Sequence, residues 1–209
     1  MMRLIYGTGN PAKLLHMREM LSPLPLEIVG IASVTDRLPA IDESGNDPLQ
    51  NAVIKAEAYF EQLHLSVFSC DSGLYIEGLD DARQPGVHVR TIGGKRLTDD
   101  EMVAYYTAIA EEMGGSCRAA YHNAICLKYD ETHSYRYMGD DLKSEPFLLT
   151  ARLHPKRVEG FPLDGLSVDL GTGLYYYDLD TVRPSGMAPG FRRFFQSALR
   201  DLGLPLGTS

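Results

Sequence analysis

The residues with the clearest potential for chemistry lie in the run Cys70-Asp71-Ser72-Gly73-Leu74. An apolar, β-prone run ends at Asp71, the chain is expected to turn at Ser72-Gly73, and a second apolar run follows. Gly73 would supply the backbone freedom for a turn or for the close approach of a ligand. Asp71 is therefore the candidate catalytic acid. The alternative is that Asp71 and Ser72 only initiate a turn.

A second candidate site lies near the N-terminus, where a strand expected at residues 3–6 leads into Gly7-Thr8-Gly9-Asn10. Asn10 is a suitable N-cap, and Pro11 suits the first position of the helix that follows. Such a loop directs free amide hydrogens at an anion, and Lys13 adds a positive charge. The P-loop pattern and the third glycine of a dinucleotide fingerprint are absent. A phosphate site and a plain capped helix both remain open.

A third set of candidates lies on the helix expected from residue 48 onward. Asp47 can cap this helix, and Gln50 completes a capping box. The apolar residues predict one buried stripe, whereas Asn51 and Lys55, one turn apart, are expected together on the opposite face. From helical position alone, Lys55 would be a solvated lysine.

The remaining pattern contains both strands and helices. Strands are expected at residues 3–6, 26–31, 67–70, 74–76, 118–129 and 134–138, and helices after residues 10, 47 and 98 and near 191–202. Arg192 and Arg193 would lie in the first turn of the last helix, where the helix dipole disfavours cations. Their position suggests a nearby anion.

Composition limits the class of protein. A chain of 209 residues with 44% hydrophobic content suits one globular domain or two lobes that share a core. No run reaches the roughly 18 apolar residues of a membrane helix, and the three cysteines match no disulfide or metal-knuckle spacing, so we expect a soluble, cytoplasmic protein with reduced thiols and no membrane partner. A net charge of −8 argues against a nucleic-acid partner, although a local basic cluster can still bind small anions.

Four short motifs occur in order: Thr-Gly-Asn-x-x-Lys at residues 8–13, Glu43 before Asn-Ala-x-x-Lys-Ala at residues 51–56, Asp-Ser-Gly-Leu at residues 71–74, and Pro-Gly at residues 85–86. In order and spacing they resemble the Ham1-like inosine/xanthosine triphosphate pyrophosphatases. The resemblance implies a single α/β domain over residues 1–209, with a long, twisted, mixed sheet flanked by helices. It further implies two lobes with a nucleotide-binding cleft between them, and a homodimer.

The resemblance also implies a hydrolase that converts ITP, dITP or XTP to the monophosphate and pyrophosphate with Mg²⁺. Asp71 matches the family's base, and Glu43 and Asp71 are the hard oxygen ligands that Mg²⁺ prefers. Phe161 and Asp164 fall where the family has Gly-Phe-Gly-Tyr-Asp, and Arg192 falls where it has Ser-His-Arg. The implied substrate contacts are Thr8, Gly9, Asn10, Lys13, Asn51, Lys55, Ser72, Gly73, Phe161, Asp164 and Arg192.

The chain departs from the family pattern at several positions. Cys70 replaces the first of two adjacent acids, Gln50 replaces a glutamate, and Leu163 replaces the tyrosine of the base-contacting motif. The histidine before Arg192 is absent, and Arg183 is only a loose substitute for a family lysine. Two alternatives therefore stay open: a non-catalytic nucleotide-binding or sensor protein on the same scaffold, and a pyrophosphatase for another modified nucleotide.

Overall fold

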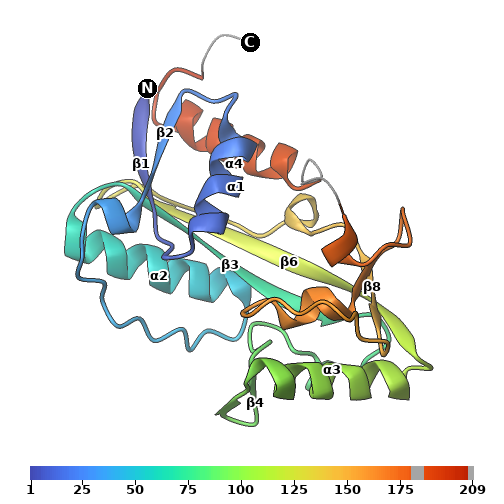
Figure 1. The fold of residues 1–209 in the computed structure, drawn as a ribbon. Helices are drawn as coiled ribbons and strands as arrows, with labels where there is room; N and C mark the ends of the chain where they lie inside the picture. Colours follow the sequence, from blue (N-terminus) through green and yellow to red (C-terminus); the bar gives the residue numbers. More distant parts are fainter. Residues whose placement is uncertain (180–185, 207–209) are drawn as a thin grey trace. The chain divides into compact units, whose positions relative to one another are not determined.

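The computed structural model describes residues 1–179 and 186–206 (Figure 1), so Arg183 lies outside the described residues. The chain divides into two compact units. Unit 1 comprises Met1–Ser72, His122–Lys143 and Pro184–Ser209, and unit 2 comprises Gly73–Tyr121 and Ser144–Arg183. No helix in the described ranges is long and apolar enough to cross a membrane.

The architecture is α/β, as predicted. A seven-stranded mixed sheet has the order β2-β1-β3-β6-β8-β9, with β7 paired to β6, and a separate pair joins β4 and β5. The strands are β1 Met2–Tyr6, β2 Leu26–Gly30, β3 Val67–Ile76, β4 Thr91–Ile92, β5 Lys95–Arg96, β6 Ser116–Lys128, β7 Ser134–Tyr137, β8 Phe147–Thr150 and β9 Ser167–Asp169. The helices are α1 Pro11–Leu21, α2 Pro48–Leu63, α3 Asp99–Glu112 and α4 Ala188–Asp201.

In unit 1, β1 runs parallel to both β2 and β3, and helices cover both faces of these strands (Figure 1). Side chains alternate between the faces along each strand. Tyr6 and Phe68 pack in one cluster with residues of α1 and α4, whereas Ile5 and Val67 pack with Tyr59 of α2. Along β3, side chains in register with Val67 therefore face α2, and side chains in register with Phe68 face α1 and α4.

The turn expected at Ser72-Gly73 is wrong, because β3 does not end there. It continues through Asp71, Ser72 and Gly73 as one ten-residue strand. Beyond Ser72, Leu74 and Gly86 exchange backbone hydrogen bonds of 2.8 and 3.0 Å, and a Cβ on Gly73 would lie 3.0 Å from the Gly86 carbonyl. The glycine serves the close approach of a second backbone segment, so no turn is needed.

Unit 2 has its own core under helix α3. A capping box begins this helix, because Thr98 accepts from the Glu101 amide at 3.2 Å and Glu101 accepts from the Thr98 amide at 2.9 Å. Tyr106 of α3 is fully buried in a cluster with Phe147 of β8 and Leu163. Leu163 belongs to a short 3₁₀ helix, Pro162–Leu166, that packs against α3.

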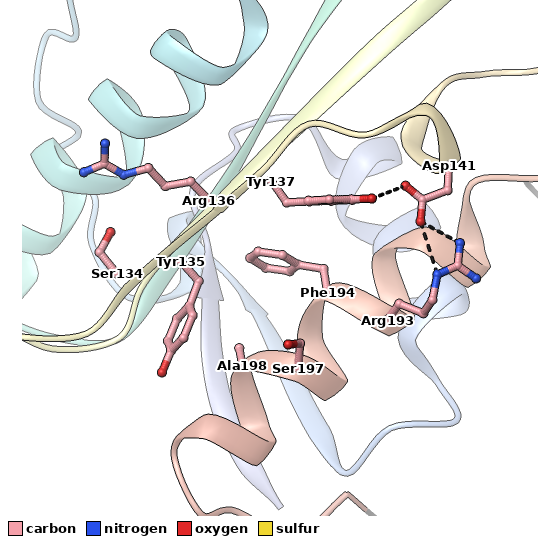
Figure 2. Close-up of a pocket in the computed structure, with 9 residues that line it drawn as sticks. All are labelled: Ser134, Tyr135, Arg136, Tyr137, Asp141, Arg193, Phe194, Ser197 and Ala198. Atoms are coloured by element: carbon pink, nitrogen blue, oxygen red, sulfur yellow. Dashed lines mark hydrogen bonds and ion pairs between the residues drawn. The ribbon is translucent and has the colours of Figure 1, made fainter.

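Helix α4 begins at Ala188, earlier than expected, so Arg192 and Arg193 lie in its second turn. The expected anion is present for Arg193, because Asp141 accepts from its Nε at 3.2 Å and from its Nη2 at 2.5 Å. Figure 2 shows this pair in a pocket lined by β7 and α4, where the Tyr137 hydroxyl also donates to Asp141 at 2.7 Å. Arg192 instead donates from Nε to the Met20 carbonyl at 2.7 Å.

Candidate functional site

Asp71 lies on the face of β3 that meets α2, and two side chains of α2 hold its carboxylate. Lys55 Nζ lies 2.6 Å from Asp71 Oδ1, and Asn51 Nδ2 donates to Asp71 Oδ2 at 3.1 Å. The Lys55 and Asp71 side chains are only 12% and 14% exposed. Each carboxylate oxygen keeps a further lone pair, so the acid is oriented and can still accept a proton.

Glu43 joins this cluster from the loop before α2. Its Oε2 lies 3.0 Å from Lys55 Nζ, and its side chain is 50% exposed. The loop is tied to α2 because Asn51 Oδ1 accepts from the Gly45 amide at 2.9 Å, and a Cβ on Gly45 would come within 2.5 Å of that oxygen. The buried Asn51 amide thus positions the Glu43 loop and Asp71 together.

Helix α2 presents these groups because its sheet-facing side is built from small residues. Ala52 and Ala56 are fully buried against β6, which allows the helix to approach the sheet closely. The expected opposite face for Asn51 and Lys55 was wrong: Asn51 is 3% exposed and lies beside Ala52 on the buried side. The buried side of α2 therefore includes a polar residue, while the apolar Leu49 and Val53 are only partly buried.

The start of α2 confirms part of the predicted capping box. Asp47 is the N-cap and accepts from the Gln50 amide at 2.9 Å. The Gln50 side chain donates to the Asp47 carboxylate at 2.8 Å and accepts from the Asn46 amide at 3.1 Å, so its return bond goes one residue upstream of the N-cap. Gln50 therefore fixes the helix start without a negative charge.

The charge of Lys55 is secured by its two acids. Burial alone would lower the pKa of Lys55, but Asp71 and then Glu43 outweigh it, and the pKa is raised. Lys55 is therefore a protonated ammonium between two carboxylates. Coulombic attraction is strong at such a poorly solvated point, so Lys55 keeps its positive charge there.

The loop after β1 forms a capped helix start, and the amides of Gly7, Thr8, Asn10, Ala12 and Lys13 all donate within the protein, which corrects the expectation of several free amides. Asn10 caps α1, with its Oδ1 accepting from Ala12 N at 2.9 Å and from Lys13 N at 3.4 Å. A Cβ on Gly7 would collide with Ser69 and Tyr59, so only glycine fits there. Gly9 is exposed with open space around its Cα, and Lys13 is exposed with no ion-pair partner among the described residues.

The other face of β3 carries Cys70 and Ser72. Cys70 packs in the cluster formed with α1 and α4 and is a free thiol. Burial raises the pKa of Cys70 to about 12, against the opposing effects of the Tyr6 hydroxyl and of the Lys13 and Lys55 charges. The site lysines therefore lie within electrostatic range of this thiol.

Ser72 donates from Oγ to Asn123 Oδ1 of β6 at 2.6 Å. Asn123 belongs to none of the predicted motifs. The available signal was its polarity, because it occupies the face of β6 that carries the buried Ile125 and Leu127. A polar residue on an apolar strand face requires a hydrogen-bond partner, and here that partner is Ser72.

Three predicted substrate contacts belong to unit 2. Gly73 lies in β3 against Gly86, Phe161 is 48% exposed, and burial raises the pKa of Asp164. Phe161 is thus an exposed aromatic and not a core residue, whereas Leu163, at the family's tyrosine position, is buried. The cluster around Asp71, the loop of residues 8–13, and Arg192 all belong to unit 1. The nucleotide cleft between lobes stays a prediction.

The acids fit a divalent cation held with the help of substrate. Glu43 Oε2 and Asp71 Oδ1 point toward the same position. The Lys55 Nζ atom occupies it, at 3.0 Å from Glu43 Oε2 and 2.6 Å from Asp71 Oδ1. Across residues 1–179 and 186–206 no group of three or more metal-binding side chains occurs. Mg²⁺ commonly takes one or two carboxylates and completes its shell with water and substrate phosphates, so two acids are sufficient.

Comparison with known proteins places this geometry in a family. A sequence model of the Ham1 family matches residues 4–140. A dITP/XTP pyrophosphatase of Rhodopseudomonas palustris is 26% identical over 191 residues, which cover 90% of this chain and 86% of the relative. A dITP/XTP pyrophosphatase of Thermus thermophilus is 32% identical over 166 residues, covering 79% and 75%.

Solved structures agree on the fold. A HAM1 protein from Coxiella burnetii superposes with a TM-score of 0.68 at 24% identity, covering 97% of this chain and 96% of that one. The Ham1 protein of Staphylococcus aureus gives the same TM-score of 0.68 at 16% identity, covering 96% and 99%. Because the family model spans the loop after β1, the Glu43 loop, α2 and Asp71, the chain belongs to the Ham1 family.

Proposed function

We propose that this protein is a nucleoside triphosphate pyrophosphatase that hydrolyses non-canonical purine triphosphates, such as dITP, ITP and XTP, to the monophosphate and pyrophosphate. The supporting observation is the cluster in which Lys55 bridges Asp71 and Glu43 while Asn51 orients Asp71. Relatives named dITP/XTP pyrophosphatase, reported above, support the substrate class.

Asp71 is proposed as the base that orients and deprotonates the attacking water. General-base catalysis requires a carboxylate held in one orientation, and the bonds from Lys55 and Asn51 fix both of its oxygens. The low exposure of Asp71 keeps competing water away. Attack at phosphorus then releases pyrophosphate, and the water proton passes to the carboxylate.

The cationic groups are proposed to bind the triphosphate. Lys13 is exposed and without an ion-pair partner in the described part of the chain, so its charge is available to phosphate. Lys55 neutralises two acids in the absence of substrate. Thr8, Gly9 and Asn10 shape the loop before Lys13, and the amide of the exposed Gly9 is proposed to contact a phosphate oxygen.

Glu43 and Asp71 are proposed to hold the divalent cation, with Mg²⁺ the expected metal. When bound, the metal would offset the charge of the phosphates and of the leaving pyrophosphate. Phe161 and Asp164 of unit 2, with Arg192 of unit 1, are proposed as contacts to the nucleotide. A homodimer and a cytoplasmic location stay predictions.

The decisive experiment is pyrophosphate release from a panel of nucleoside triphosphates, with Mg²⁺ and with a chelator. We expect turnover of dITP, ITP and XTP above that of dATP and dGTP, and loss of activity on chelation. Binding of the same nucleotides is measured in parallel by calorimetry. Binding without turnover of any triphosphate would contradict the proposal and favour a nucleotide sensor.

A further inference from the structure

Asn123 connects the site strand to three other segments of unit 1. Its Oδ1 accepts from Ser72 Oγ at 2.6 Å, and its Nδ2 donates to the Leu142 carbonyl at 2.7 Å and lies 2.9 Å from Met187 Sδ. Leu142 ends the 3₁₀ helix Asp140–Leu142, and Met187 is the N-cap of α4. Ser72 is thus linked to the start of α4 through a single amide.

These contacts fix the orientation of the amide. If Asn123 were turned over, its Oδ1 would face the Leu142 carbonyl oxygen, and two acceptors would lie at hydrogen-bond distance without a proton. Nδ2 must therefore face Leu142, and Oδ1 must face Ser72. Because an amide oxygen cannot donate, the single hydroxyl proton of Ser72 is committed to Asn123.

We propose that Asn123 is a positioning residue that makes Ser72 a hydrogen-bond acceptor in the nucleotide site. Ser72 then offers only oxygen lone pairs to a ligand. A phosphate oxygen is itself an acceptor and gains nothing from such a group, so the partner of Ser72 is a hydroxyl-type donor: a sugar hydroxyl of the nucleotide, or an ordered water. This assignment rests on the nucleotide hydrolysis proposed above and narrows the role of Ser72 within it.

The test combines Ser72→Ala, Asn123→Ala and the double variant, with turnover and nucleotide binding measured for each. We expect each single change to lower kcat/KM about three- to tenfold, the range for one hydrogen bond. The kcat/KM of the double variant should be no lower than that of the less active single variant, because Asn123 acts through Ser72. Asn123→Asp retains an acceptor for the Ser72 proton and should recover activity relative to Asn123→Ala, even if it is no more stable.

Nucleotides with different sugars identify the donor. If it is a sugar hydroxyl, the Ser72→Ala defect should disappear with a 2′,3′-dideoxy triphosphate. If it is water, the defect should be equal for ribo, deoxy and dideoxy substrates. The first outcome supports an acceptor role directly, whereas the second supports it only together with recovery of activity in Asn123→Asp, and an equal defect without that recovery would overturn it.

Ser66→Ala is the matched control, because Ser66 Oγ donates to the Tyr129 carbonyl at 2.7 Å just before β3 begins. It should lower thermal stability and leave kinetics unchanged. Wild-type kinetics and binding in both Ser72→Ala and Asn123→Ala, with stability alone reduced, would overturn the assignment. If the unmodified protein binds nucleotides without hydrolysing them, hydrolysis is refuted and the binding series still tests Asn123. If it binds none, both proposals fail.

Discussion

The two faces of strand β3 perform different tasks within a few residues of each other. The face toward α2 carries Asp71 in a charged cluster with Lys55, Asn51 and Glu43. The face toward α1 and α4 carries Phe68 and Cys70 in an apolar cluster, followed by Ser72. Successive side chains of a strand point to opposite faces, so a single residue step separates these environments.

The difference bears directly on the replaced acid. Cys70 stands where the family pattern described above has a carboxylate. Its side chain lies on the opposite face of β3 from the groups that hold Asp71. A second acid at this position would approach Tyr6 and the site lysines through the α1 side. The Asp71, Glu43 and Lys55 cluster is complete without it.

The largest expected effect comes from the α2 face. Asp71→Asn removes the proposed base and should lower kcat by about 10²- to 10⁴-fold, the usual contribution of general-base catalysis. The amide is nearly isosteric, so the fold should persist, as checked by circular dichroism and thermal unfolding. Near wild-type kcat in this variant would contradict the role of Asp71.

Lys55→Met should follow, with a loss in kcat/KM of about 100-fold. The change removes a cation that the triphosphate needs and leaves Asp71 poorly exposed without its ion pair, so thermal stability should also fall clearly. Lys95→Met is the control: Lys95 pairs with Glu101 on the surface, with the two side chains 67% and 39% exposed. Exposed pairs contribute about 0–1 kcal/mol, so this variant should keep its activity. Equal losses in both variants would refute the special role of Lys55.

Much of the fold was readable from local signals. Asn10 and Asp47 cap α1 and α2, Thr98 caps α3, and the hairpin of β6 and β7 forms where the turn residues 130–132 occur. These features depend on contacts within a few residues, which sequence spacing records. The turn at Ser72-Gly73 was wrong because the same residues can serve a turn or a close strand neighbour, and only the pairing with Gly86 decides between them.

The site was predictable as a set of residues and less so as an arrangement. Asp71, Lys55 and Glu43 were identified from their motifs, but their mutual contacts join segments 12 to 16 residues apart. Asn51 was expected on an open helix face, because hydrophobicity alone cannot reveal a buried amide that is satisfied by Asp71 and Gly45. Asn123 was missed for the same reason, since Ser72 lies 51 residues away.

The α1 face should respond more weakly. Cys70→Asp places a carboxylate near Lys13 and should weaken triphosphate affinity about three- to fivefold, the effect of one partly solvated charge pair. The Mg²⁺ concentration for half-maximal rate should stay within about twofold, because the new acid faces away from Glu43 and Asp71. Cys70→Ser, the uncharged control, should leave both quantities unchanged. A markedly lower Mg²⁺ concentration for half-maximal rate in Cys70→Asp would mean that residues on both faces of β3 bind the metal.

The smallest effect is a pH dependence of stability. Burial raises the pKa of Cys70 from 9.0 to about 12. Between these values the folded protein retains a proton that the unfolded chain has released, so this thiol's contribution to stability is complete below pH 9 and is lost as pH rises toward 12. Urea unfolding of wild type and Cys70→Ser from pH 8 to 10.5 should therefore show a steeper decline in the free energy of unfolding for wild type.

Cys126→Ser provides the comparison, because burial raises the pKa of Cys126 only to about 11 and its side chain packs against α2. Identical slopes for wild type and Cys70→Ser would show that the thiol on the α1 face is more solvated than its position in the apolar cluster implies.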